Sequence, residues 1–269
     1  MNQKSIESLI KRAAKAGTSF DLTIYDHLRE DLFFSDEEAI RLRIENPDHF
    51  APQSYFAFDF ERVGEILAKG FFFFFWKSKA TGRAPRLIAH DLISSIPVIG
   101  TSFAEALGAW SQCLANFSTK FGGEPRVECM GFDLLEPGET SRIKVYTRLV
   151  NSSFDAVIYL YTLGGMLKDP ATFKGLELLK QFWHVVCGVE DGSDFGKQEV
   201  PCLHEGWADI IVNWEFKPGS KFPKPKFYMP LWRWLPDESV ICERLSEYWR
   251  QVGWEKQAST YAQDRQEIL

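Results

Sequence analysis

Apolar and polar positions alternate in three separate stretches of this chain, and the stretches between them have the spacing of helices. Each alternating stretch contains an aromatic, an acidic and an apolar residue in a row: FDF at 58–60, FDL at 132–134 and WEF at 214–216. Alternation with a period of two is typical of a β-strand with one buried face. We therefore predict a strand at each triplet.

A lysine follows each triplet and stands two positions before an aromatic residue. The pairs are Lys69 and Phe71, Lys144 and Tyr146, and Lys226 and Tyr228. The three lysines are 75 and 82 positions apart, so the whole pattern is an internal repeat. Proline and glycine in the connecting segments EPGETS and KPGSKFPKP favour chain reversal, so we predict that each copy is a β-hairpin.

Apolar residues recur at helical spacing between and after the hairpins. The predicted helical segments are APRLIAHDLISSI, TSFAEALGAWSQCLANFSTKF, SSFDAVIYLYTLGGML, ATFKGLELLKQFWHVVCGV, DESVICERLSEYWRQVG and WEKQASTYAQDRQEIL. Hairpins that alternate with helices predict an α+β fold, in which an antiparallel sheet carries its helices on one face.

The run KGFFFFFWKSK at 69–79 concentrates aromatic rings between basic residues. It is too short to cross a bilayer as a helix, which needs about 20 apolar residues. Its ring content is typical of a strand that is buried on both faces. We predict that this run is a core strand.

Alternation also divides the segment SRIKVYTR between two faces of its strand. One face carries Arg142, Lys144, Tyr146 and Arg148, and the aliphatic residues between them face the helices. A solvated face would explain one such strand. Because the lysine and its aromatic neighbour recur on three hairpins, we predict that the sheet curls into a full or partial barrel, with three polar rows lining one lumen.

Converging lysines, an arginine and aromatic rings suit the ionisation of an allylic diphosphate. Cationic side chains bind a diphosphate through charge-assisted hydrogen bonds. Aromatic faces stabilise the resulting carbocation and exclude water. The sequence has no carboxylate cluster of the DDxxD kind that would bind magnesium, so we predict a metal-independent reaction without a cofactor.

Charge and cysteine content bear on the binding partners and the cellular compartment of the protein. A net charge of -6 and a pI near 5.5 argue against electrostatic binding to nucleic acid or to an anionic membrane. The five dispersed cysteines form no CxxC pair, which suits reduced thiols in the cytoplasm. The first segment, MNQKSIESLIKRAAKAG, lacks the apolar core of a signal peptide and predicts an amphipathic helix with Ile6, Leu9 and Ile10 on one face.

Three segments resemble the fungal indole prenyltransferases of the dimethylallyltryptophan synthase type. GFDLLEPGETSRIKVYTR is similar to the central hairpin of that family, AFDFERVGEILAKGFFFFFWKSKATGR to the preceding one and PKPKFYMPLWRW to the following one. The resemblance implies the αββα barrel, in which ten antiparallel strands are ringed by helices. It also implies metal-independent transfer of a dimethylallyl group from its diphosphate to an indole or tryptophan-derived acceptor, in indole alkaloid biosynthesis and related secondary metabolism.

The resemblance further implies roles for individual residues. The diphosphate would be held by Lys69, Arg142, Lys144 and Lys226. The carbocation would be shielded by Phe71, Tyr146 and Tyr228, although Phe71 stands where the family has a tyrosine and therefore lacks its hydroxyl. Apart from the resemblance, a carboxylate in the lumen could accept the proton of the acceptor. Glu128 and Asp209 are candidates, and structural salt bridges are the commoner role for such residues.

Three hairpins provide about six strands, so we expect a single incomplete αββα domain over 1–269 with about three of five repeat units. The opening unit, with its indole-anchoring acid, and the final hairpin, with further tyrosines, are expected to be missing. Uncovered edges and apolar surface favour aggregation. We therefore expect a homo-oligomer such as a dimer, another protein or a rearranged chain end to cover them.

Three functions stay open at this point. The first is the aromatic prenyltransferase. The second is a cyclase or isomerase of the same fold that acts on a prenylated or polycyclic intermediate, favoured by the missing anchoring acid and the missing Phe71 hydroxyl. The third is a non-catalytic accessory subunit. Retention of the three lysines and Arg142 favours the first.

Overall fold

The structure is a computed structural model, which describes residues 8–12, 20–48, 52–60, 66–149, 151–192, 194–203 and 210–268. Its contacts divide the chain into two compact units. The sheet unit comprises Met1–Leu114, Pro125–Arg148 and Asn213–Lys226. The helical unit comprises Ala115–Glu124, Leu149–Val212 and Phe227–Leu269. The expectation of one domain over 1–269 stays a prediction.

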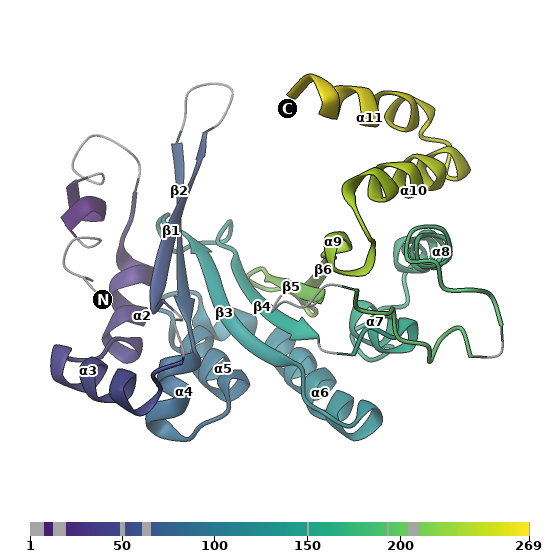
Figure 1. Cartoon of the computed structure of the whole chain (residues 1–269). Coiled ribbons are helices and arrows are strands. Elements are labelled where there is room, and N and C mark those ends of the chain that lie inside the picture. Colours follow the sequence, from purple (N-terminus) through teal and green to yellow (C-terminus); the bar gives the residue numbers. More distant parts are fainter. Residues whose placement is uncertain are drawn as a thin grey trace. The chain divides into compact units, whose positions relative to one another are not determined.

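Six strands form one sheet, in the order in which they occur along the chain (Figure 1). They are β1 (Ser54–Phe60), β2 (Ile66–Phe73), β3 (Arg126–Asp133), β4 (Ile143–Leu149), β5 (Ile210–Phe216) and β6 (Lys224–Tyr228). Neighbouring strands are antiparallel from β1 to β4. Each predicted lysine lies on its own strand, and so does each predicted triplet apart from Leu134, which follows the end of β3. The three hairpins are therefore confirmed.

The strand register decides which side chains share a face. Lys69 on β2 is paired with Asp133 on β3. Gly131, two residues before Asp133 and therefore on the same face, is paired with both Phe71 on β2 and Lys144 on β4. Lys69 and Lys144 consequently project from the same side of the sheet.

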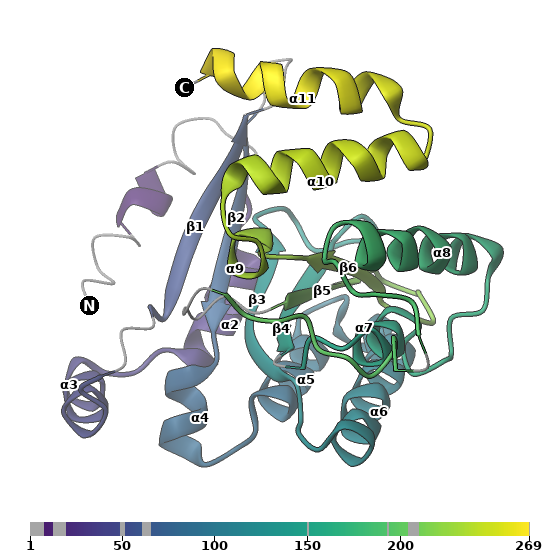
Figure 2. The ribbon, with the colours of Figure 1, turned by 45° about the vertical axis from the view of Figure 1, so that its right-hand side comes forward.

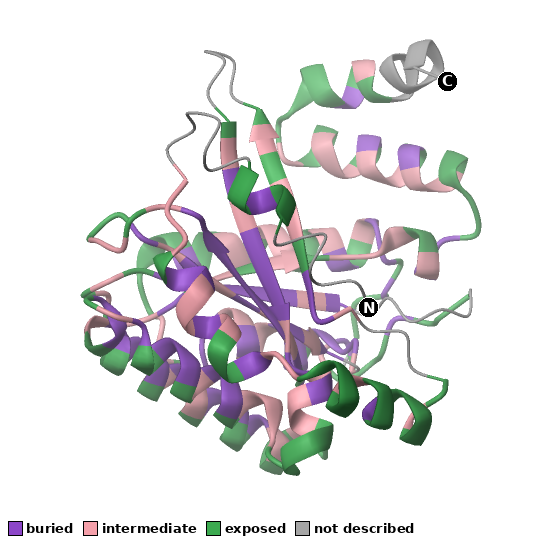
Figure 3. Cartoon of the chain, turned by 90° about the vertical axis from the view of Figure 1, so that its left-hand side faces the viewer, coloured by how far each residue is buried: buried purple, intermediate pink, exposed green. Residues whose placement is uncertain are grey.

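The helices of the sheet unit are α2 (Thr23–Leu32), α3 (Asp36–Glu45), α4 (Phe75–Thr81), α5 (Pro85–Ser95), a 3-10 turn at Gly100–Phe103 and the first part of α6 (Ala104–Phe121). Helices α2, α5 and α6 pack against the opposite side of the sheet, and α3 packs against α4. Tyr25 of α2 stacks on Phe72 with ring centroids 5.4 Å apart, and Trp110 of α6 meets Phe216 edge-on at 5.8 Å. Helix α5 packs against β3. Buried positions concentrate on the strands and on the inner sides of these helices (Figure 3), as predicted for one covered face.

The aromatic run is divided between a strand and a helix. Strand β2 ends at Phe73, and Phe74 donates its backbone N–H to the carbonyl of Glu128 on β3 (3.1 Å). The carbonyl of Phe74 then accepts from the N–H of Ser78, which is the first turn of α4. The prediction of one core strand is therefore correct up to Phe73 and wrong for Phe75 and Trp76, which begin a helix.

The helical unit contains α7 (Phe154–Tyr161), α8 (Pro170–Val185), α9 (Leu231–Trp234), α10 (Glu238–Gln251) and α11 (Glu255–Ile268) (Figure 2). The side chains of Ser153, Asp169 and Asp237 cap α7, α8 and α10 by accepting backbone N–H groups. Trp183 is fully buried in this unit and contacts the ring of Phe154 at 5.5 Å. The helical segments predicted from spacing are confirmed, except that the one at 152–167 is helical only over Phe154–Tyr161 and continues in turns.

Two further expectations concern the ends and the membrane. Residues 8–12 are helical, but Ile6 of the predicted amphipathic face lies outside the described residues. Within the described ranges, every helix is either too short or too polar to span a bilayer.

Candidate active site

The side of the sheet that faces away from the helices combines charges and rings. We term it the charged face and define it by Tyr55, Asp59, Lys69, Phe71, Cys129, Asp133, Arg142, Lys144, Tyr146 and Glu215. All of these residues belong to the sheet unit. Their neighbours on the same strands, such as Phe72, Val145 and Trp214, are fully buried against the helices.

Two carboxylates on this face hold two of the cations. Asp59 on β1 forms an ion pair with the Lys69 ammonium on β2. Asp133 on β3 accepts from Arg142, with Oδ2 lying 2.9 Å from Nε and 2.8 Å from Nη2. Both ion pairs join neighbouring parts of the sheet, so they orient the cationic side chains toward one region.

Lys144 completes this cluster of charges. Its burial, together with the positive charges of Arg142 and Lys69, lowers the pKa of Lys144 below the ordinary value. The hydrogen bond from Lys69 lowers the pKa of Asp59, and the charges of Lys144 and Arg142 act in the same direction. Burial opposes protonation of Arg142, but its hydrogen bond to Asp133 raises its pKa overall. Lys69 on β2, Lys144 on β4 and Arg142 just before β4 thus act on one another, an arrangement that favours binding of a multiply charged anion.

Aromatic rings lie beside the cations on the charged face. Tyr55 stacks on Phe71 with centroids 4.3 Å apart and an interplanar angle of 17°, and Tyr146 lies 6.0 Å from Phe71. Phe71 covers Gly131, where an added Cβ would come within 2.7 Å of the ring. Burial raises the pKa of Tyr55 to about 12, which keeps its phenol neutral. The rings form a continuous apolar surface from β1 to β4.

The structure brings together most of the site residues predicted from the sequence. Lys69, Phe71, Arg142, Lys144 and Tyr146 share the charged face. Their roles toward a substrate stay predictions.

Apart from Glu128, the other predicted site residues belong to β6 or lie outside the described residues. Lys226 is exposed on β6, which β5 separates from β4. Tyr228 belongs to the helical unit. Asp209 lies outside the described residues. Lys226 as a diphosphate ligand, Tyr228 as a shielding ring and Asp209 as a base stay predictions.

Glu128 is engaged by two arginines. It lies where the register of β3 and β4 shifts, between Val127 and Cys129. Its Oε1 is 2.6 Å from Nε of Arg126 and 2.9 Å from Nε of Arg148. Two guanidinium groups neutralise the carboxylate, which supports a structural salt bridge, the commoner role for such a residue. A role as proton acceptor stays a prediction.

Sequence reasoning missed the acidic partners and one ring of the charged face. Asp59, Asp133 and Glu215 are the acids of the three repeated triplets, and their recurrence was the signal that could have assigned them to the face of the lysines. Tyr55 precedes Asp59 by four positions, an even spacing that puts both on one side of β1.

Clustered metal-binding side chains and the state of the cysteines bear on whether the site could hold a metal. Among the residues that the structure describes, no three or more histidine, cysteine, aspartate or glutamate side chains are grouped to hold a metal ion. All five cysteines are free thiols, and only Cys202 is exposed.

The sequence matches the profile of the family described as tryptophan dimethylallyltransferase over residues 1–264. The chain belongs to this family. The resemblance inferred from the hairpins is therefore confirmed.

Curated relatives are longer than this chain. It is 28% identical to 7-dimethylallyltryptophan synthase hasE of Aspergillus fumigatus, with 100% of the chain and 56% of the relative covered. It is also 28% identical to the indole diterpene prenyltransferase ptmD of Penicillium ochrochloron, with 98% of the chain and 62% of the relative covered. The chain thus spans about three fifths of the length of these relatives.

Solved structures share the fold. The crystal structure of AnaPT from Neosartorya fischeri matches 98% of this chain and 60% of its own, with a TM-score of 0.79 and 26% identity. The structure of NotF in complex with brevianamide F and DMSPP matches 96% of this chain and 60% of its own, with a TM-score of 0.76 and 25% identity. The predicted α+β fold is confirmed, with the six strands forming part of an αββα barrel.

Proposed function

We propose that this chain acts as an aromatic prenyltransferase, which transfers a dimethylallyl group from its diphosphate to an indole or tryptophan-derived acceptor. The observation that carries the proposal is the clustering of Lys69, Arg142 and Lys144 beside a continuous ring surface on the charged face. The family and the names of the relatives support it, since hasE is a dimethylallyltryptophan synthase and NotF was crystallised with brevianamide F and DMSPP.

The cations would act on the leaving group. Charge-assisted hydrogen bonds from Lys69, Arg142 and Lys144 would hold the diphosphate oxygens. As the allylic C–O bond breaks, its electron pair leaves with the diphosphate, whose increased negative charge these cations stabilise. This positive charge takes the place of a divalent metal, and the proposed reaction is therefore metal-independent.

The rings would act on the carbocation. The faces of Phe71 and Tyr146, with Tyr228 as a further proposed ring, stabilise the dimethylallyl cation and exclude water that would capture it. An aromatic carbon of the acceptor then forms the new C–C bond. The proton lost from that carbon goes to a base, for which Asp209 and Glu128 are the candidates.

The surroundings of the enzyme are part of the proposal. Because β1 and β6 are the end strands of the sheet within the described ranges, a second copy of the chain is proposed to cover sheet surface in a homo-oligomer. Free thiols suit a reducing compartment, and we place the protein in the cytoplasm.

Thermal unfolding with dimethylallyl diphosphate tests the function. In the presence of EDTA, the ligand is expected to raise Tm by several degrees through selective binding to the folded state. Lys144→Ala should abolish this rise, since it removes a central cation of the cluster. Lys180→Ala, which removes an exposed lysine 3.7 Å from Asp191 in the helical unit, should leave it unchanged.

Two results would contradict the transferase. One is the absence of any rise in Tm at saturating ligand. The other is a rise that Lys144→Ala does not alter. Tight binding of a neutral prenylated polycycle, without any effect of the diphosphate, would instead support the cyclase.

A further inference from the structure

The two carboxylates that hold the cations of the charged face differ in their freedom to move. The Asp133 side chain is 8% exposed and accepts two contacts from Arg142. The Asp59 side chain is 44% exposed and lies on β1, at one end of the strand order. Asp59 can therefore rotate toward solvent at little cost, whereas Asp133 is enclosed between β2 and β4.

The cation that Asp59 holds is one that a diphosphate would require. The Lys69 side chain is 17% exposed, and its ammonium group forms an ion pair with Asp59 on the side of the sheet that carries Arg142 and Lys144. An anion placed among these three cations would meet the negative charge of Asp59 at short range. Carboxylate and diphosphate would thus compete for one ammonium group, and they would also repel each other.

We propose that Asp59 is an internal counter-ion of Lys69 that the diphosphate must displace, so that this carboxylate limits the affinity of the site for diphosphate. The inference rests on the proposed function. Asp59 pairs with the cation while the site holds no anion, and it swings toward solvent when the diphosphate binds. After transfer, its return to Lys69 promotes release of the inorganic diphosphate.

Asp133 has the opposite effect. It remains in place beside Arg142 and directs the guanidinium toward the anion, so it is a positioning residue. Removal of the charge at Asp59 should therefore strengthen diphosphate binding, and removal of the charge at Asp133 should weaken it. A purely structural role for both residues would not produce effects of opposite sign.

Calorimetric titration of the full chain with inorganic diphosphate and with the thiolated analogue DMSPP tests the inference. Asp59→Asn is expected to lower Kd about tenfold, because both the competition and the repulsion are removed. Asp59→Ser provides a second variant with the same expected direction. Asp133→Asn is expected to raise Kd about tenfold. Melting curves without ligand verify that each variant is folded.

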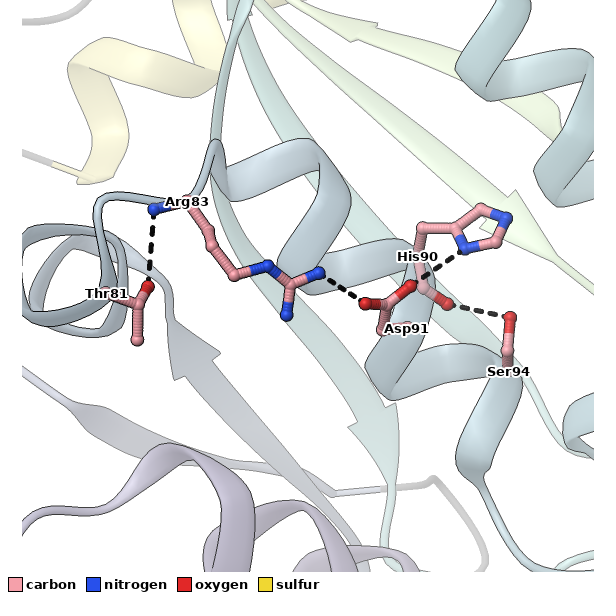
Figure 4. Close-up of polar contacts among 5 residues, drawn as sticks. All are labelled: Thr81, Arg83, His90, Asp91 and Ser94. Atoms are coloured by element: carbon pink, nitrogen blue, oxygen red, sulfur yellow. Dashed lines mark hydrogen bonds and ion pairs between the residues drawn. The ribbon is translucent and has the colours of Figure 1, made fainter.

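A matched control lies away from the charged face. Asp91 on α5 pairs with Arg83, next to His90, in a cluster on the helical side of the sheet unit (Figure 4). Its side chain is 57% exposed, comparable with that of Asp59. Asp91→Asn removes the same charge from a similar ion pair, and Kd should stay within about twofold of the unmodified protein.

A double-mutant cycle identifies Lys69 as the shared partner. Lys69→Met should raise Kd, and adding Asp59→Asn to it should produce less than half of the original gain. Competition for Lys69 would be overturned if Asp59→Asn tightened diphosphate binding as much in the Lys69→Met background as in the unmodified protein. It would also be overturned if Asp59→Asn alone left Kd unchanged or raised it. If the unmodified protein binds diphosphate and Asp59→Asn does not bind more tightly, this inference fails while the proposed function stands. If neither protein binds diphosphate, both fail.

Discussion

The two faces of the sheet are built from the same strands, but they meet different physical demands. On the helix-covered face, Phe72, Trp214 and Phe216 are fully buried and pack against aromatic and aliphatic side chains. On the charged face, Lys144 and Tyr146 are partly exposed, and ion pairs rather than close packing orient the side chains. The first face contributes most of the stability, and the second carries the chemistry.

The charged face contains one side chain, Lys144, whose charge is held unfavourably in the folded state. The lowered pKa of Lys144 means that the folded chain holds this ammonium, partly buried and beside Arg142 and Lys69, less favourably than water would. Functional sites often retain such unfavourable arrangements because the ligand relieves them. The covered face contains no comparable group among the described residues of β2 and β4.

The largest expected effect distinguishes two adjacent phenylalanines of β2. Phe72→Ala should lower the free energy of unfolding by about 3–5 kcal/mol, because it leaves a cavity beneath α2. Phe73 lies on the same side of β2 as Phe71 and contacts Tyr55 of the charged face. Phe73→Ala removes this partly exposed ring and should cost about 1 kcal/mol. Urea denaturation measures both values. Equal losses would show that the two faces do not differ in packing.

A smaller effect is expected at two glycines that allow rings to lie against the backbone. A Cβ at Gly70 would come within 2.6 Å of Phe132 on the covered face, and one at Gly131 within 2.7 Å of Phe71 on the charged face. Gly70→Ala should cost about 2–3 kcal/mol in urea denaturation, since Phe132 is enclosed in the core. Gly131→Ala should cost about 1 kcal/mol, because Phe71 can move outward.

Because Gly131→Ala displaces the ring of Phe71, its effect can also be measured as a change in ligand affinity. DMSPP should bind more weakly to this variant, and it should bind normally to Gly70→Ala at temperatures where that protein is folded. Calorimetric titration measures both affinities. A larger loss of stability in Gly131→Ala than in Gly70→Ala would contradict the assignment of stability to the covered face. Weaker DMSPP binding by Gly70→Ala than by Gly131→Ala would contradict the assignment of binding to the charged face.

Substitution of Lys144 should produce a modest effect of unusual sign. Lys144→Met is expected to raise Tm by about 1–2 °C at pH 7, because it removes an ammonium that the folded state disfavours. Between the lowered folded pKa of Lys144 and its unfolded value, the unfolded chain binds more protons. Stability of the unmodified protein therefore rises with pH in that window, and the advantage of Lys144→Met should shrink there. A lower Tm for the variant at pH 7 would contradict this explanation.

The smallest effect is expected for acid sensitivity at Asp59. Its folded pKa is lowered, chiefly by the hydrogen bond from Lys69, so its contribution to stability is present above the unfolded pKa and is lost as pH falls through the folded value. Because the pair is accessible to water, Asp59→Asn should change Tm at pH 7 by no more than about 1 °C. The difference should vanish once the pH falls below the lowered folded pKa of Asp59. A loss of several degrees at pH 7 would make Asp59 a structural residue.

Much of the fold and part of the site could be predicted, because both depend on local periodicity. The alternation in SRIKVYTR assigned Lys144 and Tyr146 to one face and Val145 to the other, and the register of β3 and β4 confirms that division. The end of β2 within the phenylalanine run could not be predicted. Five identical side chains carry no local signal for the residue at which hydrogen bonding passes from β3 to a helical turn.

The ion pairs of the charged face required the register as well. Asp59 lies ten positions before Lys69, and the sequence spacing alone does not bring their side chains together. The same holds for Glu128, whose proximity to Arg148 depends on a register shift between β3 and β4. A shift of one residue in either strand would have placed these charges on opposite sides.

The sequence by itself determined the three hairpins, the helices between them and the face shared by Lys69 and Lys144, because side-chain direction in a strand follows directly from residue parity. The tertiary structure alone decided which charges meet. Electrostatic interactions depend on distances between atoms of different strands, and those distances are set by strand pairing and by burial against the helices, which no local pattern in the chain specifies.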